Sequence, residues 1–143
     1  MRRVRTGGDR GRVSVFVAVA MPAILLFLAL AWDVSGYLRA LYRADAVASE
    51  AARAAGQAVD LPRLLRGDGI GVDPDGARRA AEAYLDEAGL VDARVSGRVQ
   101  VSGGGSRLSV TVEVDYRPLL VHAFGFGSPP VATGQAEALL VAG

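Results

Sequence analysis

The chain has 143 residues and a formal net charge of +1, and it contains no cysteine and a single histidine, His122. This composition excludes disulfide bridges, cysteine nucleophiles and cysteine metal sites. The length allows one membrane anchor and one small domain. No motif places Ser, His and Asp side chains together, so we expect no enzyme, no cofactor and no small-molecule substrate.

The small net charge hides a strong asymmetry along the chain. Five arginines and one aspartate precede Val13, whereas eleven arginines and fourteen acidic residues follow from Asp33 onward. A basic flank and an acidic flank around one apolar segment indicate a membrane protein with a cytoplasmic N-terminus. We therefore expect residues 1–12 to form a basic cytoplasmic leader and the C-terminal part to lie outside the cytoplasm. Membrane topology explains the arginine cluster without a nucleic-acid partner. All sixteen basic residues are arginine, which is typical of a GC-rich bacterial genome.

Residues 13–32, VSVFVAVAMPAILLFLALAW, hold no charge and only one polar residue, Ser14. A twenty-residue helix is about 30 Å long, which matches the hydrocarbon core of a bilayer. Eleven Val, Ile, Leu or Phe residues favour insertion by roughly 3 to 7 kcal/mol. The pattern predicts a single transmembrane helix in contact with the lipid bilayer. We expect Trp32, Tyr37 and Tyr42 to anchor its far end at the membrane interface.

Residues 33–59 are rich in Ala, Leu and Arg, which are strong helix formers. Their small and apolar positions recur every three or four residues, so we expect the membrane helix to continue outside the bilayer with a narrow alanine-lined face. Two interpretations of that face remain open. It packs only on this chain's own sheet, or it packs against a neighbouring subunit, alone or in addition to the sheet. Gly36 is a predicted weak point.

Residues 60–143 are expected to form a small exported domain. The stretch from Asp60 to Gly71 contains Pro62 and several glycines and should break the helix. A second helix is predicted from Asp73, a preferred N-cap residue followed by proline, to Gly89. The acidic residues Asp68, Asp73 and Asp75 fit capping better than calcium binding, because the ligand spacing of a calcium loop is absent.

Period-two alternation predicts three strands. Residues 91–101 and 108–116 alternate apolar and polar side chains around the glycine-rich turn 102–106, and residues 131–141 close the sheet with small side chains at even positions. An apolar turn or short helix and a loop, residues 118–130, include His122, which we interpret as structural. The expected fold is α+β: a long N-terminal transmembrane helix continues into a small exported domain, in which a short helix and a three-stranded antiparallel sheet pack on the outer half of the long helix.

At the start of the hydrophobic segment, Gly11, Ala18 and Pro22 stand at a spacing that resembles the start of the TadE-like family, which comprises pilin-like proteins of tight-adherence pilus systems. The alanine-rich extension also resembles that family. The resemblance implies a pilin-like pseudopilin of a pilus-assembly or secretion apparatus. It also implies hetero-oligomeric contacts with other pilus or secretion subunits, and cleavage by a prepilin-type peptidase at the processing site, between Gly11 and Arg12.

One position departs from the family pattern. Five residues after the implied cut, where such subunits commonly carry Glu, this chain has Phe16. In pilins that carboxylate is thought to pair with a neighbouring subunit's N-terminal amine, which Phe16 cannot do. The resemblance therefore implies a minor or accessory role rather than that of a major filament subunit.

Two alternatives share the same small domain. Ala29, Leu30 and Ala31 resemble a signal-peptidase site, and cleavage there would release an exported soluble or cell-surface binding module. Without any cleavage the chain is a single-pass membrane protein of unknown partner.

Overall fold

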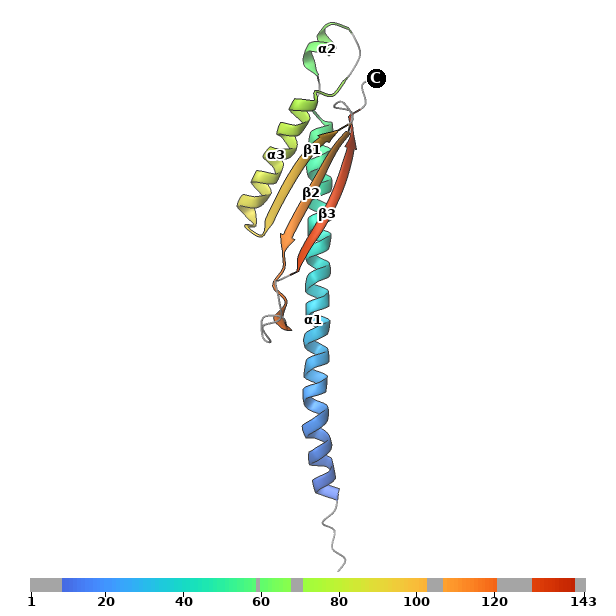
Figure 1. Ribbon diagram of the computed structural model, residues 1–143, viewed down its shortest axis with the longest axis vertical. Coiled ribbons are helices and arrows are strands. Elements are labelled where there is room, and N and C mark those ends of the chain that lie inside the picture. The colour runs from blue at the N-terminus through green and yellow to red at the C-terminus, as the bar shows by residue number, and fades with distance from the viewer. Residues whose placement is uncertain (1–8, 59, 68–70, 103–106, 121–129, 141–143) are drawn as a thin grey trace, which may run out of the picture.

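The computed structural model describes residues 9–58, 60–67, 71–102, 107–120 and 130–140. The elements in chain order are helices α1 (Asp9–Gly56), α2 (Leu61–Leu65) and α3 (Pro74–Val91), followed by strands β1 (Val95–Ser102), β2 (Arg107–Asp115) and β3 (Val131–Leu139). Figure 1 shows that the N-terminal half of α1 projects far beyond the small domain, while its C-terminal half lies alongside the sheet.

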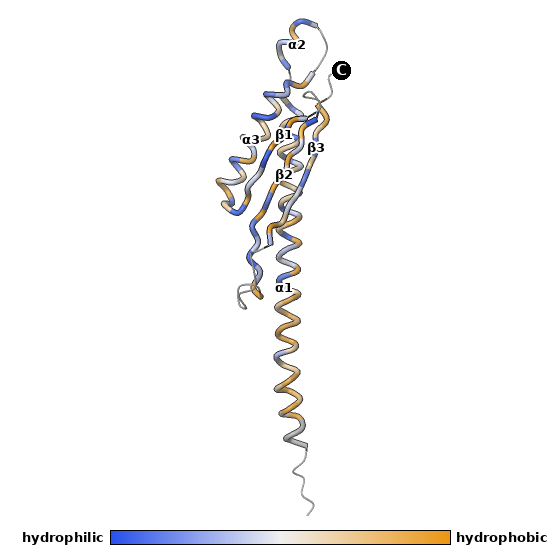
Figure 2. The backbone as a smooth tube through the Cα atoms, viewed as in Figure 1, coloured by the Kyte–Doolittle hydropathy of each residue, from blue (hydrophilic) through white to orange (hydrophobic). Residues whose placement is uncertain are grey.

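The prediction of one long helix is confirmed. Helix α1 is unbroken over 48 residues and contains Pro22 without interruption. It begins at Asp9, four residues before the predicted start, and ends at Gly56 instead of Val59. The predicted weak point at Gly36 is wrong, because the helix continues through it. Figure 2 shows the change in character along α1, from a hydrophobic N-terminal half to a mixed C-terminal half.

The sheet has the order β1-β2-β3, and both strand pairs are antiparallel. On β2 the alternation is confirmed, because Leu108, Val110 and Val112 are fully buried while Glu113 and Asp115 are exposed. Helix α1 packs on β2 and β3, and α3 packs on α1 and β1. The domain is therefore two layers, helices on one face of an antiparallel sheet, and the predicted α+β fold is confirmed.

The alanine face of α1 is part of this core. A row of five alanines along the C-terminal half of α1 is buried, with exposed fractions of 0 to 7%: Ala44, Ala48, Ala51, Ala52 and Ala55. The backbones of α1 and β3 lie very close together at Gly134 of β3. A Cβ atom added there would lie 2.7 Å from the carbonyl oxygen of Ala44, and nearer still to the carbonyl carbon of Ala44. The chain's own sheet therefore covers this face, which contradicts packing on a neighbouring subunit alone.

Helix α3 begins as its sequence predicts. The Asp73 carboxylate accepts hydrogen bonds from the backbone N–H groups of Asp75 (3.1 Å) and Gly76 (3.0 Å), which satisfies donors that the first helical turn leaves unpaired. Leu85 is buried and fills the space opposite Gly97 of β1, where a Cβ atom would lie 2.7 Å from the leucine side chain. This contact fixes α3 against the edge of the sheet.

Several boundaries differ from the predictions. Helix α3 ends at Val91 instead of Gly89, and the Asp92 N–H group bonds to the Ala88 carbonyl. Because α3 occupies residue 91, β1 begins at Val95. The sequence did not predict the five-residue helix α2. Pro62 is tolerated in the first turn of α2, because the backbone N–H that proline lacks would have no hydrogen-bond partner there. The predicted turn at 103–106, Asp68 and His122 lie outside the described residues.

Candidate functional site

The most unusual surface of the molecule is the N-terminal half of α1. Its large apolar side chains are exposed, including Phe16 at 72% and Phe27 at 70%, and none of its most apolar window is buried within the chain. By length and composition this is the one helix of the described residues that can cross a membrane. A core helix of a soluble protein would bury one face. A bilayer is the solvent that such a surface fits.

The structure places the residues of the predicted motif at the start of this surface. Gly11 and Arg12 lie in the first turn of α1, where backbone N–H groups have no intrahelical partner and unwinding breaks few bonds. Phe16 and Ala18 are exposed on the helix, and Pro22 lies within it. Phe16, Ala18 and Pro22 therefore present an exposed surface near the start of α1.

The three predicted interface aromatics have different surroundings. Trp32 and Tyr42 are 70% and 69% exposed, whereas Tyr37 is 36% exposed. The Tyr37 ring packs edge-on against the ring of Tyr116, with centroids 6.2 Å apart. Tyr37 therefore contributes to packing within the chain in addition to any contact with lipid.

Sequence reasoning missed the role of Asp33, the first charged residue after the apolar segment. Its side chain is 8% exposed. The carboxylate oxygens accept hydrogen bonds from the backbone N–H groups of Leu119 (2.7 Å) and Leu120 (2.8 Å). The Tyr116 hydroxyl donates to the Asp33 backbone carbonyl at 3.0 Å. Asp33 therefore fixes the turn that follows β2 to the point where α1 leaves the apolar segment.

Gly36 allows that attachment. A Cβ atom at Gly36 would lie 2.5 to 2.8 Å from ring and hydroxyl atoms of Tyr116. Burial, and next the nearby Asp33 carboxylate, raise the pKa of Tyr116, so the neutral phenol donates to the helix over the ordinary pH range. The signals available in the sequence were an isolated carboxylate directly after the span and a glycine one turn later.

An apolar groove lies beside this attachment. One wall is a single face of α1, and the other is formed by the segment that follows β2 and by the residue before β3. The lining residues are Leu30, Asp33, Val34, Tyr37, Leu38, Tyr116, Pro118, Leu120 and Pro130. Its volume is about 430 Å³, and the carboxylate of Asp33 is the only charged group in the lining.

Comparison with known proteins bears on the helix. The family model Tad, described as Putative Flp pilus-assembly TadE/G-like, matches residues 11–58. Over these residues the chain is similar to TadE/G-like proteins. The match begins at Gly11 and covers nearly all of α1, about a third of the chain. No curated protein and no solved structure gives a significant match.

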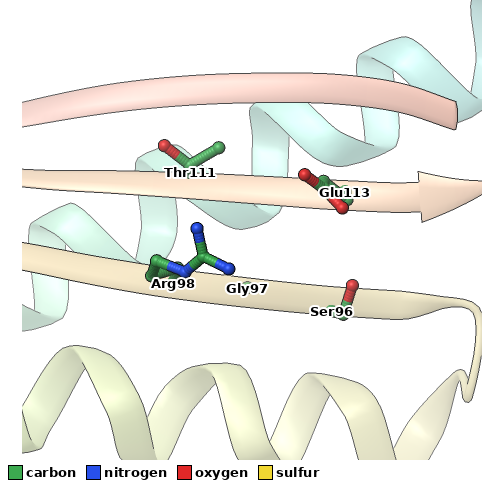
Figure 3. Close-up of a pocket in the computed structure, with 5 residues that line it drawn as sticks. All are labelled: Ser96, Gly97, Arg98, Thr111 and Glu113. Carbon is green, nitrogen blue, oxygen red and sulfur yellow. The ribbon is translucent and has the colours of Figure 1, made fainter.

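The TadE/G-like match associates the chain with pilus assembly. The small domain lies outside the matched segment, and its uncovered sheet face is polar. Figure 3 shows a shallow pocket on this face with Ser96, Gly97 and Arg98 from β1 and Thr111 and Glu113 from β2, and its volume is about 140 Å³. Within the described ranges no group of three His, Asp or Glu side chains is placed to hold a metal ion.

Proposed function

We propose that the chain is a non-catalytic, pilin-like minor subunit of a tight-adherence-type pilus assembly or secretion apparatus. The observation that carries the proposal is one unbroken helix, matched by the TadE/G-like family, with an exposed apolar N-terminal half and a C-terminal half built into a small domain. Such a protein acts by packing: its span contacts the bilayer and neighbouring helices, and its domain meets other subunits.

The charge distribution supports the orientation. The arginine-rich residues 1–12 are cytoplasmic, and the acidic domain is extracytoplasmic. The prepilin-type peptidase cuts between Gly11 and Arg12, where the first turn of α1 opens at little cost. Phe16 supplies no carboxylate for an incoming subunit's amine, which suits a minor position in the assembly rather than the repeated one.

Retention of the helix is preferred over release by signal peptidase. Ala31 lies inside α1, and the helix on its C-terminal side supplies Asp33 to the domain. A cut after Ala31 would leave Asp33 beside a frayed new end, although the domain depends on it.

Topology is tested with single-cysteine variants, since the chain has no cysteine of its own. Thr133→Cys lies on the exposed face of β3. Thr6→Cys lies in the leader and is combined with Gly11→Leu, so that the leader is kept on the chain. In intact spheroplasts a membrane-impermeant maleimide should label position 133 only, and position 6 should react only after permeabilisation. Labelling of position 6 alone in intact spheroplasts would contradict the orientation.

The role in assembly is tested by deletion and complementation. Pili counted by electron microscopy should be lost in the deletion strain, restored by the wild-type chain and not restored by Gly11→Leu, which keeps its leader. Gly56→Ala is the control, because a Cβ atom added at Gly56 meets nothing within 4 Å. Normal piliation in the deletion strain would refute the pilus role.

A further inference from the structure

The groove beside Asp33 continues the packing face of α1 toward the membrane. Its helical wall consists of Leu30, Asp33, Val34, Tyr37 and Leu38, which are spaced as one face of a helix. The same face continues into the buried alanine row under the sheet. Below the end of the sheet, the described residues cover this face only in part, with Pro118 and Leu120 on one side.

The position of the groove along α1 matches the edge of the bilayer. Residues 13–32 fill the hydrocarbon core, and Leu30 to Leu38 cover about 12 Å of the helix axis. The lower end of the groove therefore lies at the depth of acyl chains, and the upper end at the depth of headgroups. Trp32, which is 70% exposed, stands at the level that such rings prefer.

The charged groups in and around the groove suit a position at the boundary between hydrocarbon and headgroups. Inside it, the Asp33 carboxylate is satisfied by two backbone N–H groups, which lowers the cost of a charged group beside hydrocarbon. Outside it, Arg39 lies close enough to Tyr116 to act on the pKa of that residue. Arg39 is exposed, so its guanidinium is accessible to a ligand from outside the chain.

We propose that this groove holds an acyl chain of a membrane phospholipid, with the phosphate at Arg39, so that the small domain is seated on the bilayer. Continuity with the exposed apolar surface of the span favours lipid over a second protein. The volume of about 430 Å³ lies within the roughly 300 to 1,000 Å³ of typical ligand pockets. The proposal rests on the membrane span of the proposed function.

The experiment uses the full chain with single spin labels in phosphatidylcholine–phosphatidylglycerol vesicles at low protein density. Leu119→Cys reports the turn beside the groove, where the leucine is 57% exposed. Leu90→Cys is the matched control: this leucine is 88% exposed near the end of α3, where the contact between Arg43 and Asp92 (3.3 Å) places it about 15 Å farther along α1 than Asp33. Leu25→Cys reports the span itself.

Accessibility to oxygen and to a water-soluble nickel complex distinguishes the occupants. Lipid contact should give position 119 high oxygen and low nickel accessibility, like position 25, with at least a fivefold lower nickel value than position 90. Equal nickel values at 119 and 90 would overturn the proposal. Low values for both reagents would also overturn it, and would indicate a second copy if they rise on dilution of the protein, or residues 121–129 if they do not.

A second pair of labels tests occupancy of the groove. Leu38→Cys lies in the groove wall, whereas exposed Ser35 lies outside the lining and about 4.5 Å nearer the membrane. If lipid fills the groove, position 38 should be less accessible to nickel than position 35, which reverses the order expected from depth alone. The ordinary depth order would contradict the proposal. A water-exposed label at position 25 would refute the membrane span and therefore the proposed function as well.

Discussion

Substitution of Gly134 by Ala tests the contact that joins the sheet to the long helix. The added Cβ atom would lie 2.7 Å from the Ala44 carbonyl oxygen, whereas ordinary van der Waals contacts lie at 3.4 to 4 Å. Because the neighbouring atoms are backbone atoms of a helix inside a packed layer, no side chain can turn away. Strand β3 must move from α1 by about an ångström, and overpacking of this kind costs about 1 to 3 kcal/mol.

The loss is measurable as a shift of the unfolding midpoint. With m of about 1 to 2 kcal/mol per molar urea, a loss of 2 kcal/mol lowers the midpoint by about 1 to 2 M. The assay is a short trypsin pulse after equilibration of the detergent-solubilised full chain in urea. It reports the intact fraction of the domain through its many arginines.

Gly56→Ala is the control, because a Cβ atom there meets nothing within 4 Å. It should leave the midpoint unchanged or raise it by the equivalent of about 0.5 to 1 kcal/mol, the usual gain of Ala over Gly in a helix. If Gly134→Ala unfolds at the wild-type urea concentration, β3 does not rest on the α1 backbone, and the two-layer packing described above is wrong.

Three further outcomes are expected. Asp33→Ala leaves the backbone N–H groups of Leu119 and Leu120 without their acceptor, at about 1 to 3 kcal/mol each. Native-state hydrogen exchange at these two N–H groups should therefore become faster while the amides of β2 stay protected; unchanged exchange would contradict the attachment. Val112→Asp puts a carboxylate at a fully buried position and should unfold the domain in the urea assay, whereas Thr111→Asp, on the opposite face of β2, should not. The pKa of Tyr116 is raised in the folded state. The stability that its neutral hydroxyl contributes is therefore present below about pH 10, the unfolded pKa, and is lost as pH rises through the folded pKa. Tyr116→Phe should show a smaller fall in stability than the wild type between pH 9 and 11, and an identical fall in both proteins would contradict this role of the hydroxyl.

Much of the fold could be predicted because it depends on periodicity. The uncharged stretch before Asp33, the alanine row after it and the alternation on β2 each impose one structure on a local segment. The N-cap at Asp73 is likewise a local device, and it was predicted correctly.

What sequence reasoning missed depends on contacts between distant residues. Asp33 and Leu119 are 86 positions apart, and nothing near Asp33 reveals that its carboxylate caps a distant turn. Gly36 reads as a helix weak point until Tyr116 is placed against it. Helix α2 was missed because its five residues carry no periodic pattern long enough to recognise, and it is held in place by tertiary bonds such as that from Asp60 N–H to the Gly71 carbonyl (2.8 Å).

The central claim is that the long helix stays in the membrane as part of the mature, processed subunit. The most direct test is the intact mass of the protein purified from native membranes, with Gly11→Leu beside it. The expected mature chain begins at Arg12, and the variant should keep residues 1–11. A chain beginning at Trp32 would mean that the apolar half of α1 is discarded on export, and a chain beginning at Met1 would mean that no peptidase acts at Gly11; either result would contradict the account.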